Sequence, residues 1–180
     1  MASEENLQAV VRADVQGIRD HFGYDLVSIY LQEKDHLTLQ HQVGYEDVIE
    51  RIPVTSGVMA RALRTGSPVL LPDVRKDPEF LGAIPGIRSE VCVPLFVGDM
   101  AAGVLNVETI DEELNTHDLD LFLALGADVS LAMQRARLVS SESTPTTSTP
   151  PRPPPSSALE RLISGASSAA GGATGRSSCS

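Results

Sequence analysis

The residues best suited to chemistry lie where a long loop enters an apolar strand. Ser89 and Glu90 open this strand, and Cys92 follows between two valines. The carboxylate of Glu90 could face a pocket and accept hydrogen bonds from a ligand, or it could accept them from the loop backbone. The sequence does not distinguish these roles, because both need the same acceptor geometry. Cys92 could be a redox-active or cofactor-bearing thiol, but its place in the strand predicts a small buried apolar side chain.

The loop before this strand carries further candidates, which are acidic. Asp73, Asp77 and Glu79 could bind a metal ion or the cationic group of a ligand. Arg75 and Lys76 lie between them, and such alternating charges are typical of a solvated loop. Asp73 differs from the other two because it follows an apolar strand, so we expect it at the rim of a pocket.

Two other features have structural explanations. Gly57 could begin a helix whose free amide groups hold an anion, although Ser56 explains the same sequence as an N-terminal cap. The four histidines lack the spacing of metal ligands, and no Cys and His pair of the kind that attaches a bilin is present. The sequence therefore assigns no catalytic residue, no metal ligand and no cofactor.

The long loop, residues 73–88, must position the acidic groups. Two prolines and two glycines prevent it from forming one long helix, and loops of this length are usually functional or mobile. It also carries four large apolar side chains, which predict either a ligand pocket between loop and sheet or a dry small core. The expected ligand-binding residues are Asp73, Phe80, Ile84, Ile87, Ser89, Glu90, Val91 and Val93, with Asp73 and Glu90 as polar anchors.

The surrounding elements follow from the spacing of apolar residues. A helical period predicts a first helix that ends at Gly23, and a shorter helix is expected at residues 57–64. Apolar runs at residues 26–31, 37–43 and 69–71 predict strands. Two buried strands joined by a type II′ turn at Gly98 come next, and a long apolar helix closes the pattern.

Three segments in this order resemble the GAF domain family. They are residues 52–66, residues 68–74 and the hairpin at residues 89–108, and the resemblance extends over about residues 5–138. It implies an α+β (α/β) fold with a central antiparallel sheet, terminal helices on one face and a loop-covered pocket on the other. It also implies a sensory or regulatory domain that binds a small molecule and signals through a helical dimer interface, as part of a bacterial signalling system.

The resemblance leaves two alternatives open. One GAF subfamily is free methionine-(R)-sulfoxide reductase, which uses a catalytic Cys in the long loop and a partner Cys near the pocket helix. This chain has no Cys between residues 73 and 88, and Met59 stands in the helix, so the thiols match poorly. The other alternative is a domain with a vestigial pocket that only dimerises. The ligand is not identified, and the signalling effector domain is expected on another chain.

Composition and charge narrow the class of protein further. The chain has 180 residues, of which 42% are hydrophobic and 4% aromatic, so we expect one domain with an aliphatic core. The net charge is −10, and residues 1–139 carry −11 because the few charges after them sum to +1. This acidity argues against nucleic-acid binding. No membrane-spanning segment or signal peptide is recognised, so a cytoplasmic location is expected.

The two ends of the chain carry separate predictions. Residues 1–139 are expected to form the GAF domain, and residues 140–180 a disordered Pro/Ser/Thr/Gly-rich tail or linker. The last helix has more apolar residues than one sheet face can bury. We therefore expect a homodimer in which Val129 and Met133 join Leu7, Val11 and Ile18 in a helical bundle.

Overall fold

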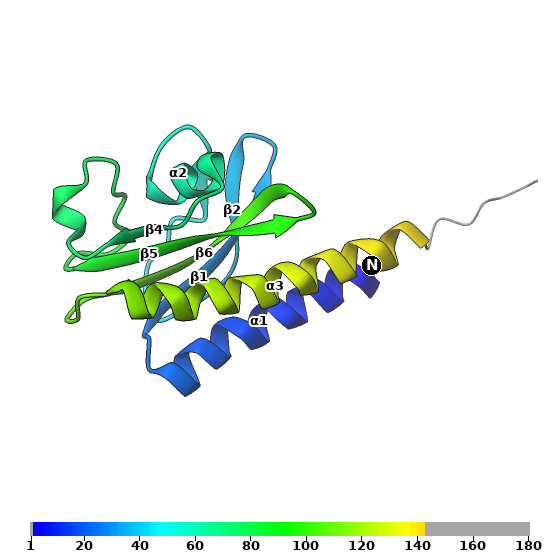
Figure 1. The fold of residues 1–180 in the computed structure, drawn as a ribbon, viewed down its shortest axis with the longest axis horizontal. Coiled ribbons are helices and arrows are strands. Elements are labelled where there is room, and N and C mark those ends of the chain that lie inside the picture. The colour runs from blue at the N-terminus through cyan, green and yellow to red at the C-terminus, as the bar shows by residue number, and fades with distance from the viewer. Residues whose placement is uncertain (1, 143–180) are drawn as a thin grey trace, which may run out of the picture. The chain divides into compact units, whose positions relative to one another are not determined.

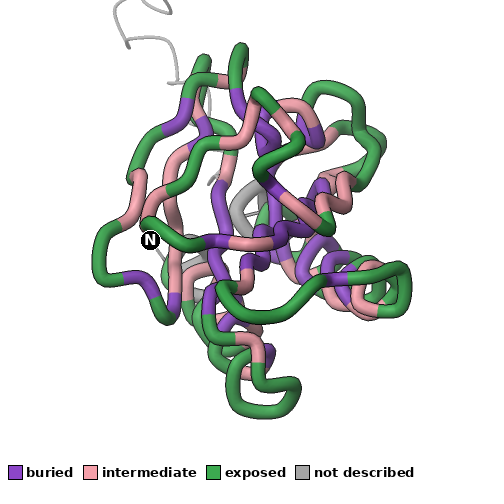
Figure 2. Tube along the Cα trace, turned by 90° about the vertical axis from the view of Figure 1, so that its left-hand side faces the viewer, coloured by how far each residue is buried: buried purple, intermediate pink, exposed green. Residues whose placement is uncertain are grey.

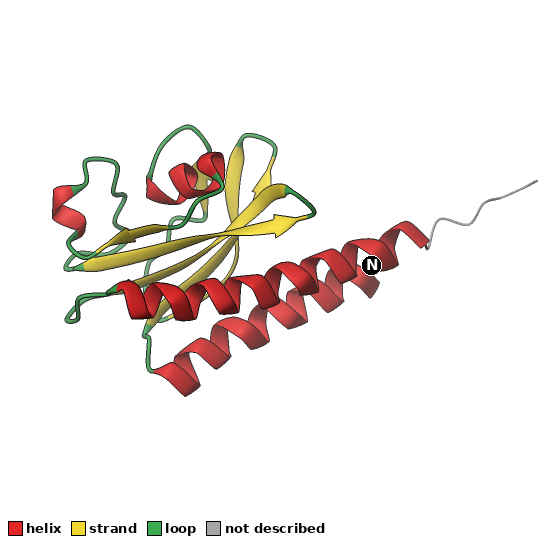
Figure 3. Ribbon diagram, in the orientation of Figure 1, coloured by secondary structure: helices red, strands yellow, loops and turns green. Residues whose placement is uncertain are grey.

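The computed structural model describes the backbone of residues 2–142 and the side chains of residue 5 and residues 7–138. The predicted tail lies outside the described residues from position 143 onward. In chain order the elements are α1 (Ala2–Phe22), β1 (Leu26–Glu33), β2 (His36–Val43), β3 (Arg51–Pro53), α2 (Val58–Thr65), β4 (Val69–Leu71), η1 (Val74–Lys76), β5 (Ser89–Val97), β6 (Met100–Thr109) and α3 (Thr116–Glu142), as Figures 1 and 3 show. None of the described helices combines the length and the apolar character needed to cross a bilayer.

The six strands form one antiparallel sheet in the order β3-β2-β1-β6-β5-β4. Strands β5 and β6 are joined by the expected two-residue turn, in which Gly98 has a φ of 63° and Asp99 does not enter the positive-φ region. The turn pairs Val97 with Met100, and a register shift between Leu95 and Phe96 then moves the pairing by one residue. Beyond this shift Glu90 lies opposite Glu108, and Cys92 lies opposite Asn106.

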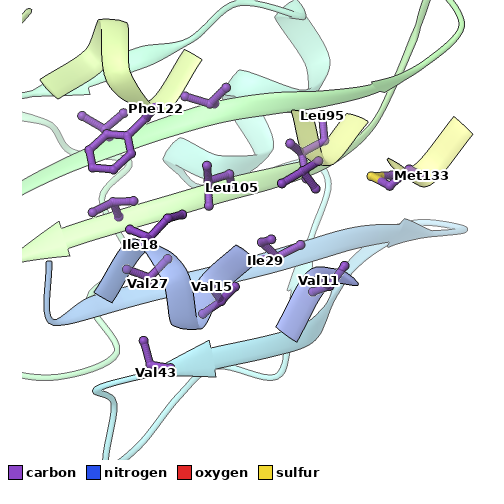
Figure 4. Close-up of a cluster of buried hydrophobic side chains, with 14 of the residues drawn as sticks. Val11, Val15, Ile18, Val27, Ile29, Val43, Leu95, Leu105, Phe122 and Met133 are labelled. Carbon is purple, nitrogen blue, oxygen red and sulfur yellow. The ribbon is translucent and has the colours of Figure 1, made fainter. Parts of the chain in front are cut away.

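The terminal helices cover one face of the sheet, and α2 with the long loop covers the other (Figure 1). Figure 4 shows how side chains from α1 and α3 meet those of the strands in the main core. A second cluster packs α2 against the opposite face and includes Cys92. Figure 2 shows that buried positions gather along the strands, whereas much of the connecting backbone is exposed. The fold therefore agrees with the architecture expected from the sequence.

The start of α3 is fixed by a reciprocal cap. Asn115 Oδ1 accepts a hydrogen bond from the His117 amide at 2.8 Å, and Asp118 Oδ2 accepts one from the Asn115 amide at 2.8 Å. The Tyr24 hydroxyl donates to the other oxygen of Asp118, and the Tyr24 ring packs edge-on against Phe122 with centroids 4.7 Å apart. Tyr24 thus ties the end of α1 to the first turns of α3.

The predicted cap of α2 is wrong. Gly57, and not Ser56, is the N-cap residue, and no side chain caps this helix. Gly57 has a φ of 92°, and a Cβ at this position would lie 2.8 Å from Leu81 Cδ1. The chain therefore enters α2 through a tight turn beneath the long loop that only glycine tolerates. Ser56 is exposed and lies one residue too early to cap the helix.

The residues proposed for a dimer interface also need correction. Val129 and Met133 are only 1% and 5% exposed, because both pack into the core beneath α3. They are therefore unavailable to a second subunit. The exposed apolar side chains of α3 include Leu123 and Leu131, which are 38% and 46% exposed.

Candidate functional site

Two carboxyl groups face each other in the interior of the sheet. Glu90 on β5 and Glu108 on β6 occupy opposite positions of the antiparallel pair, and they are 2% and 3% exposed. Both side chains lie on the face that α2 and the long loop cover, together with Cys92 and Asn106. Burial of two acidic groups so close together is unfavourable unless protons or cations neutralise them.

The hydrogen bonds of this pair are incomplete. The Tyr45 hydroxyl donates to Glu108 Oε2 at 2.6 Å. The Cys92 thiol has one proton to share between Glu90 Oε1, at 3.3 Å, and Asn106 Oδ1, at 3.2 Å. Glu90 Oε2 is buried and has no hydrogen-bond partner among the described residues. Buried polar atoms nearly always have a partner, so this oxygen is an exception that calls for a functional explanation.

Burial controls the protonation of the pair. It raises the pKa of Glu90 to about 8, with a further increase from the neighbouring Glu108. It also raises the pKa of Glu108 to about 7, against the lowering effect of the Tyr45 hydrogen bond. Because each carboxylate disfavours ionisation of the other, the ligand-free pair retains a proton at neutral pH. Burial, followed by the charge of Glu90, likewise raises the pKa of the Cys92 thiol well above its ordinary value.

A small cavity lies beside Glu108, between the sheet and the long loop. Tyr30 and Asn106 line it from the sheet, Tyr45 lines it from the segment between β2 and β3, and Leu81 lines it from the long loop. Its volume is about 10 Å³, which is room for about one water molecule. The space beneath the loop is therefore the size of one small polar group.

A larger and more open cavity of about 570 Å³ begins at the same glutamate. Its lining contains six acidic residues and no Lys, Arg or His. The acidic residues are Asp25, Glu46, Asp47, Glu108, Asp111 and Glu112. Of the described residues, Glu108 is the one that lines both cavities.

The loop over the inner cavity is held by an arginine of α2. Arg61 contacts Asp77 at 2.6 Å and Glu79 at 3.0 Å, so one guanidinium holds two loop carboxylates. The ends of the loop are joined where the Val74 amide donates to the Arg88 carbonyl at 2.9 Å. Asp77 and Glu79 therefore anchor the loop, which agrees with their interpretation as loop residues.

Some of the predicted ligand-binding residues are near the cavities. Glu90 belongs to the carboxyl pair, and Ile84 lines the outer cavity. Ile87 and Phe80 pack in the small cluster beneath the loop, which also contains Leu26 and Tyr45. The sequence predicts either a ligand pocket or a dry small core beneath the loop. The structure shows features of both, because the apolar residues of the loop form a small core that borders a pocket.

The other predicted residues have different positions. Asp73 caps η1 by accepting from the Arg75 amide at 3.2 Å, and it also pairs with the Arg75 side chain at 2.7 Å. Ser89 accepts a hydrogen bond from the Leu114 amide at 3.0 Å and donates to the Glu112 carbonyl at 2.9 Å. Neither residue lines one of the two cavities.

Val91 and Val93 must be removed from the predicted pocket. Both pack in the main core against the terminal helices. Successive side chains of a strand point to opposite faces, so these valines cannot share a face with Glu90. The expectation overlooked this alternation.

Sequence reasoning also missed Glu108, Asn106 and Tyr45. The signal for the first two is present in β6, where polar residues at positions 106 and 108 alternate with buried apolar ones. Polar residues on one face of a buried strand indicate a polar site. Tyr45 comes from the segment between β2 and β3, and only the folded structure brings it to Glu108.

The chain belongs to the GAF domain family, whose family model matches residues 6–133. Among solved structures, it is similar to a free methionine-R-sulfoxide reductase from Neisseria meningitidis in complex with its substrate, with 26% identity, a TM-score of 0.71, and coverage of 77% of this chain and 84% of that one. The type II free methionine-R-sulfoxide reductase from Thermoplasma acidophilum has 20% identity and a TM-score of 0.69, over 74% of this chain and 96% of that one. A GAF domain from an Acinetobacter phosphoenolpyruvate-protein phosphotransferase has 19% identity and a TM-score of 0.66, over 76% and 90%. A search of curated proteins gave no match.

The carboxyl pair predicts how stability depends on pH. Burial raises the pKa of Glu90 to about 8 in the folded state, from an ordinary value of 4.5 that applies when the chain is unfolded. The folded state therefore binds more protons in this range, and the free energy of unfolding should fall as pH rises from 4.5 to 8. Urea unfolding of Glu90→Gln should show a weaker pH dependence, because the amide does not ionise. The exposed control Glu50→Gln should behave like the wild type. A slope that is unchanged in Glu90→Gln would contradict the assignment.

Proposed function

We propose that this GAF domain is a sensory or regulatory module that binds a small molecule at the Glu90–Glu108 pair. The observation that carries the proposal is Glu90 Oε2, a buried carboxyl oxygen without a partner among the described residues. It lies on the same face as the inner cavity, opposite the glutamate that lines both cavities. A vestigial pocket would have no need to keep two carboxyl groups buried at this cost.

Binding can influence the terminal helices through β5. Glu90 is on one face of this strand, and Val93 is on the other. The backbone of α3 lies close to β5, because a Cβ at Gly126 would be 2.7 Å from Val93 Cγ1. Ser130 of α3 also accepts a hydrogen bond from the Phe96 amide at 2.9 Å. We infer that a ligand that favours one position of β5 favours one position of α3, and that an effector domain on another chain receives the change.

The direct test of ligand binding is native mass spectrometry of protein purified from cells that express it naturally. We expect a retained small molecule in the wild type and its loss in Glu90→Gln, because the amide presents one acceptor where the carboxylate presents two. The exposed variant Glu50→Gln should retain the molecule. Absence of any ligand from wild-type protein, together with no binding by a broad metabolite screen, would favour a domain that only dimerises.

We propose further that the domain forms a homodimer through the exposed apolar side chains of α3. Sedimentation of a double variant, Leu123→Glu with Leu131→Glu, should show a monomer, because buried charges at an interface are strongly unfavourable. Met100 is more exposed than either leucine and lies in the β5–β6 hairpin, so Met100→Glu is the matched control. A wild type that sediments as a monomer at high micromolar concentration would show the proposal to be wrong.

The second candidate function is reduction of free methionine sulfoxide, which the similarity to the two reductase structures favours. The thiol chemistry argues against it. Cys92 is fully buried, and its pKa is raised by burial and by Glu90, whereas reactive cysteines are accessible thiolates. An assay with free methionine-(R)-sulfoxide and a thiol reductant should show no turnover. Turnover that is lost in Cys92→Ser would establish the reductase.

A further inference from the structure

We propose that the pocket recognises the ammonium group of a small organic amine, with Glu90 and Glu108 as its counter-ions. The inference rests on the proposed function of ligand binding and adds the chemical class of the ligand. It depends on the size of the inner cavity, on the acceptors around it, and on the charge of the outer cavity.

The two cavities fit the two parts of an alkylamine. The inner one has room for about one water molecule, and a primary ammonium group is of about that size. The rest of the molecule needs more space, which the outer cavity of about 570 Å³ offers. Glu108 lines both cavities, so an ammonium group in the inner one and a carbon chain in the outer one would both contact it.

The lining of the inner cavity contains the carboxyl group of Glu108, the amide group of Asn106 and the hydroxyl groups of Ser28, Tyr30 and Tyr45. Glu90, opposite Glu108 on the neighbouring strand, adds a buried carboxyl oxygen, Oε2, that has no donor among the described residues. The Tyr30 hydroxyl is no free donor, because it already donates to the Ile49 carbonyl at 2.7 Å. An ammonium group has three donors and no acceptor, so its hydrogen-bonding capacity complements this set. Tyr30 and Tyr45 also line the cavity with aromatic rings, whose faces favour cations.

The charge of the outer cavity selects between two kinds of ligand. A protonated Glu90 could instead donate to an acceptor such as a carboxylate or phosphate. An anion of that kind would have to pass six acidic residues with no basic residue in the cavity lining. The negative electrostatic potential of these acidic residues attracts a cation. Metal ions are a poorer match, because the described residues contain no group of three His, Cys, Asp or Glu side chains that could hold one.

The other charged groups near Glu90 do not replace the missing cation. It is faced by Glu108 from β6, by Cys92 from β5, by Tyr30 from β1 and by Tyr45 before β3. Asp77 of the loop and Arg61 of α2 also act on it from further away. Arg61 is the one cation of this set, and it is already paired with Asp77 and Glu79. An ammonium group would therefore displace a proton from the carboxyl pair, and amine affinity should rise with pH.

The experiment compares amines with matched neutral molecules. Butylamine and 1,4-diaminobutane are titrated calorimetrically into the full chain beside 1-butanol and 1,4-butanediol, at about pH 6 and about pH 8.5, where the amines remain charged. We expect at least one amine to bind about tenfold or more tightly at the higher pH, since ionisation of the pair lies between the two values. The alcohols should not bind measurably.

Variants and salts separate the possible outcomes. Glu90→Gln and Glu108→Gln should each lose amine binding, whereas the exposed variant Glu50→Gln should keep it. A thermal melt checks that each variant is folded. Three results would overturn the ammonium assignment: alcohols that bind as tightly as the amines, binding of butyrate, or a binding signal from potassium chloride equal to that of the amines. None of them would contradict the wider proposal that the site binds a small ligand. If no amine binds, the ammonium inference is wrong, and a ligand found by mass spectrometry would still support the wider proposal.

Discussion

The opposition of two buried carboxyl groups is the constraint on which this structure depends. The tight turn at Gly98 and the register shift between Leu95 and Phe96 together set the β5–β6 pairing, which places Glu90 against Glu108 within the sheet. The two groups cannot both be ionised there without a compensating cation. Tyr45 satisfies one oxygen of Glu108, and the Cys92 thiol can satisfy one oxygen of Glu90. The loop that shields the pair from water is itself held by Arg61. An unsatisfied oxygen is retained at the centre of this arrangement, and natural proteins accept such costs mainly at functional sites.

The same two strands give the site a connection to the rest of the molecule. Their pocket face carries the carboxyl pair, and their other face packs directly beneath α3, with close contact at Gly126. A well-packed interior responds to a local change by small movements of whole elements, because it has few voids to absorb the change. A ligand at the pair is thus separated from α3 by the thickness of one sheet. This arrangement suits regulation, and it needs no reactive thiol, in keeping with the buried and poorly acidic Cys92.

Much of the fold could be predicted from the sequence, because it depends on local patterns. Helical spacing gave α1 and α3, short apolar runs gave the strands, and Gly98 gave the hairpin turn. The site is harder to predict than the fold, because its residues come from segments that lie far apart in the chain. Glu90 was identified from its place at a strand entry, but Tyr45 reaches Glu108 only through the fold. Val91 and Val93 face the terminal helices, which the apolar composition of the strand does not reveal but its two-residue period does. Sequence propensity favours Ser56 as a cap because the packing of Leu81 over Gly57 is a tertiary contact that propensity does not contain.

The central claim is that the Glu90–Glu108 pair holds a proton at neutral pH in the ligand-free protein. The most direct measurement is a carbon-13 NMR titration of the glutamate side-chain carboxyl groups, with these two resonances assigned by the Glu90→Gln and Glu108→Gln variants. The account predicts two coupled steps, of which at least one occurs above neutral pH, and a downward shift of the remaining step when either partner is replaced. Titration of both groups near the ordinary glutamate value of about 4.3 would show that the pair is solvated and ionised, and would contradict the account.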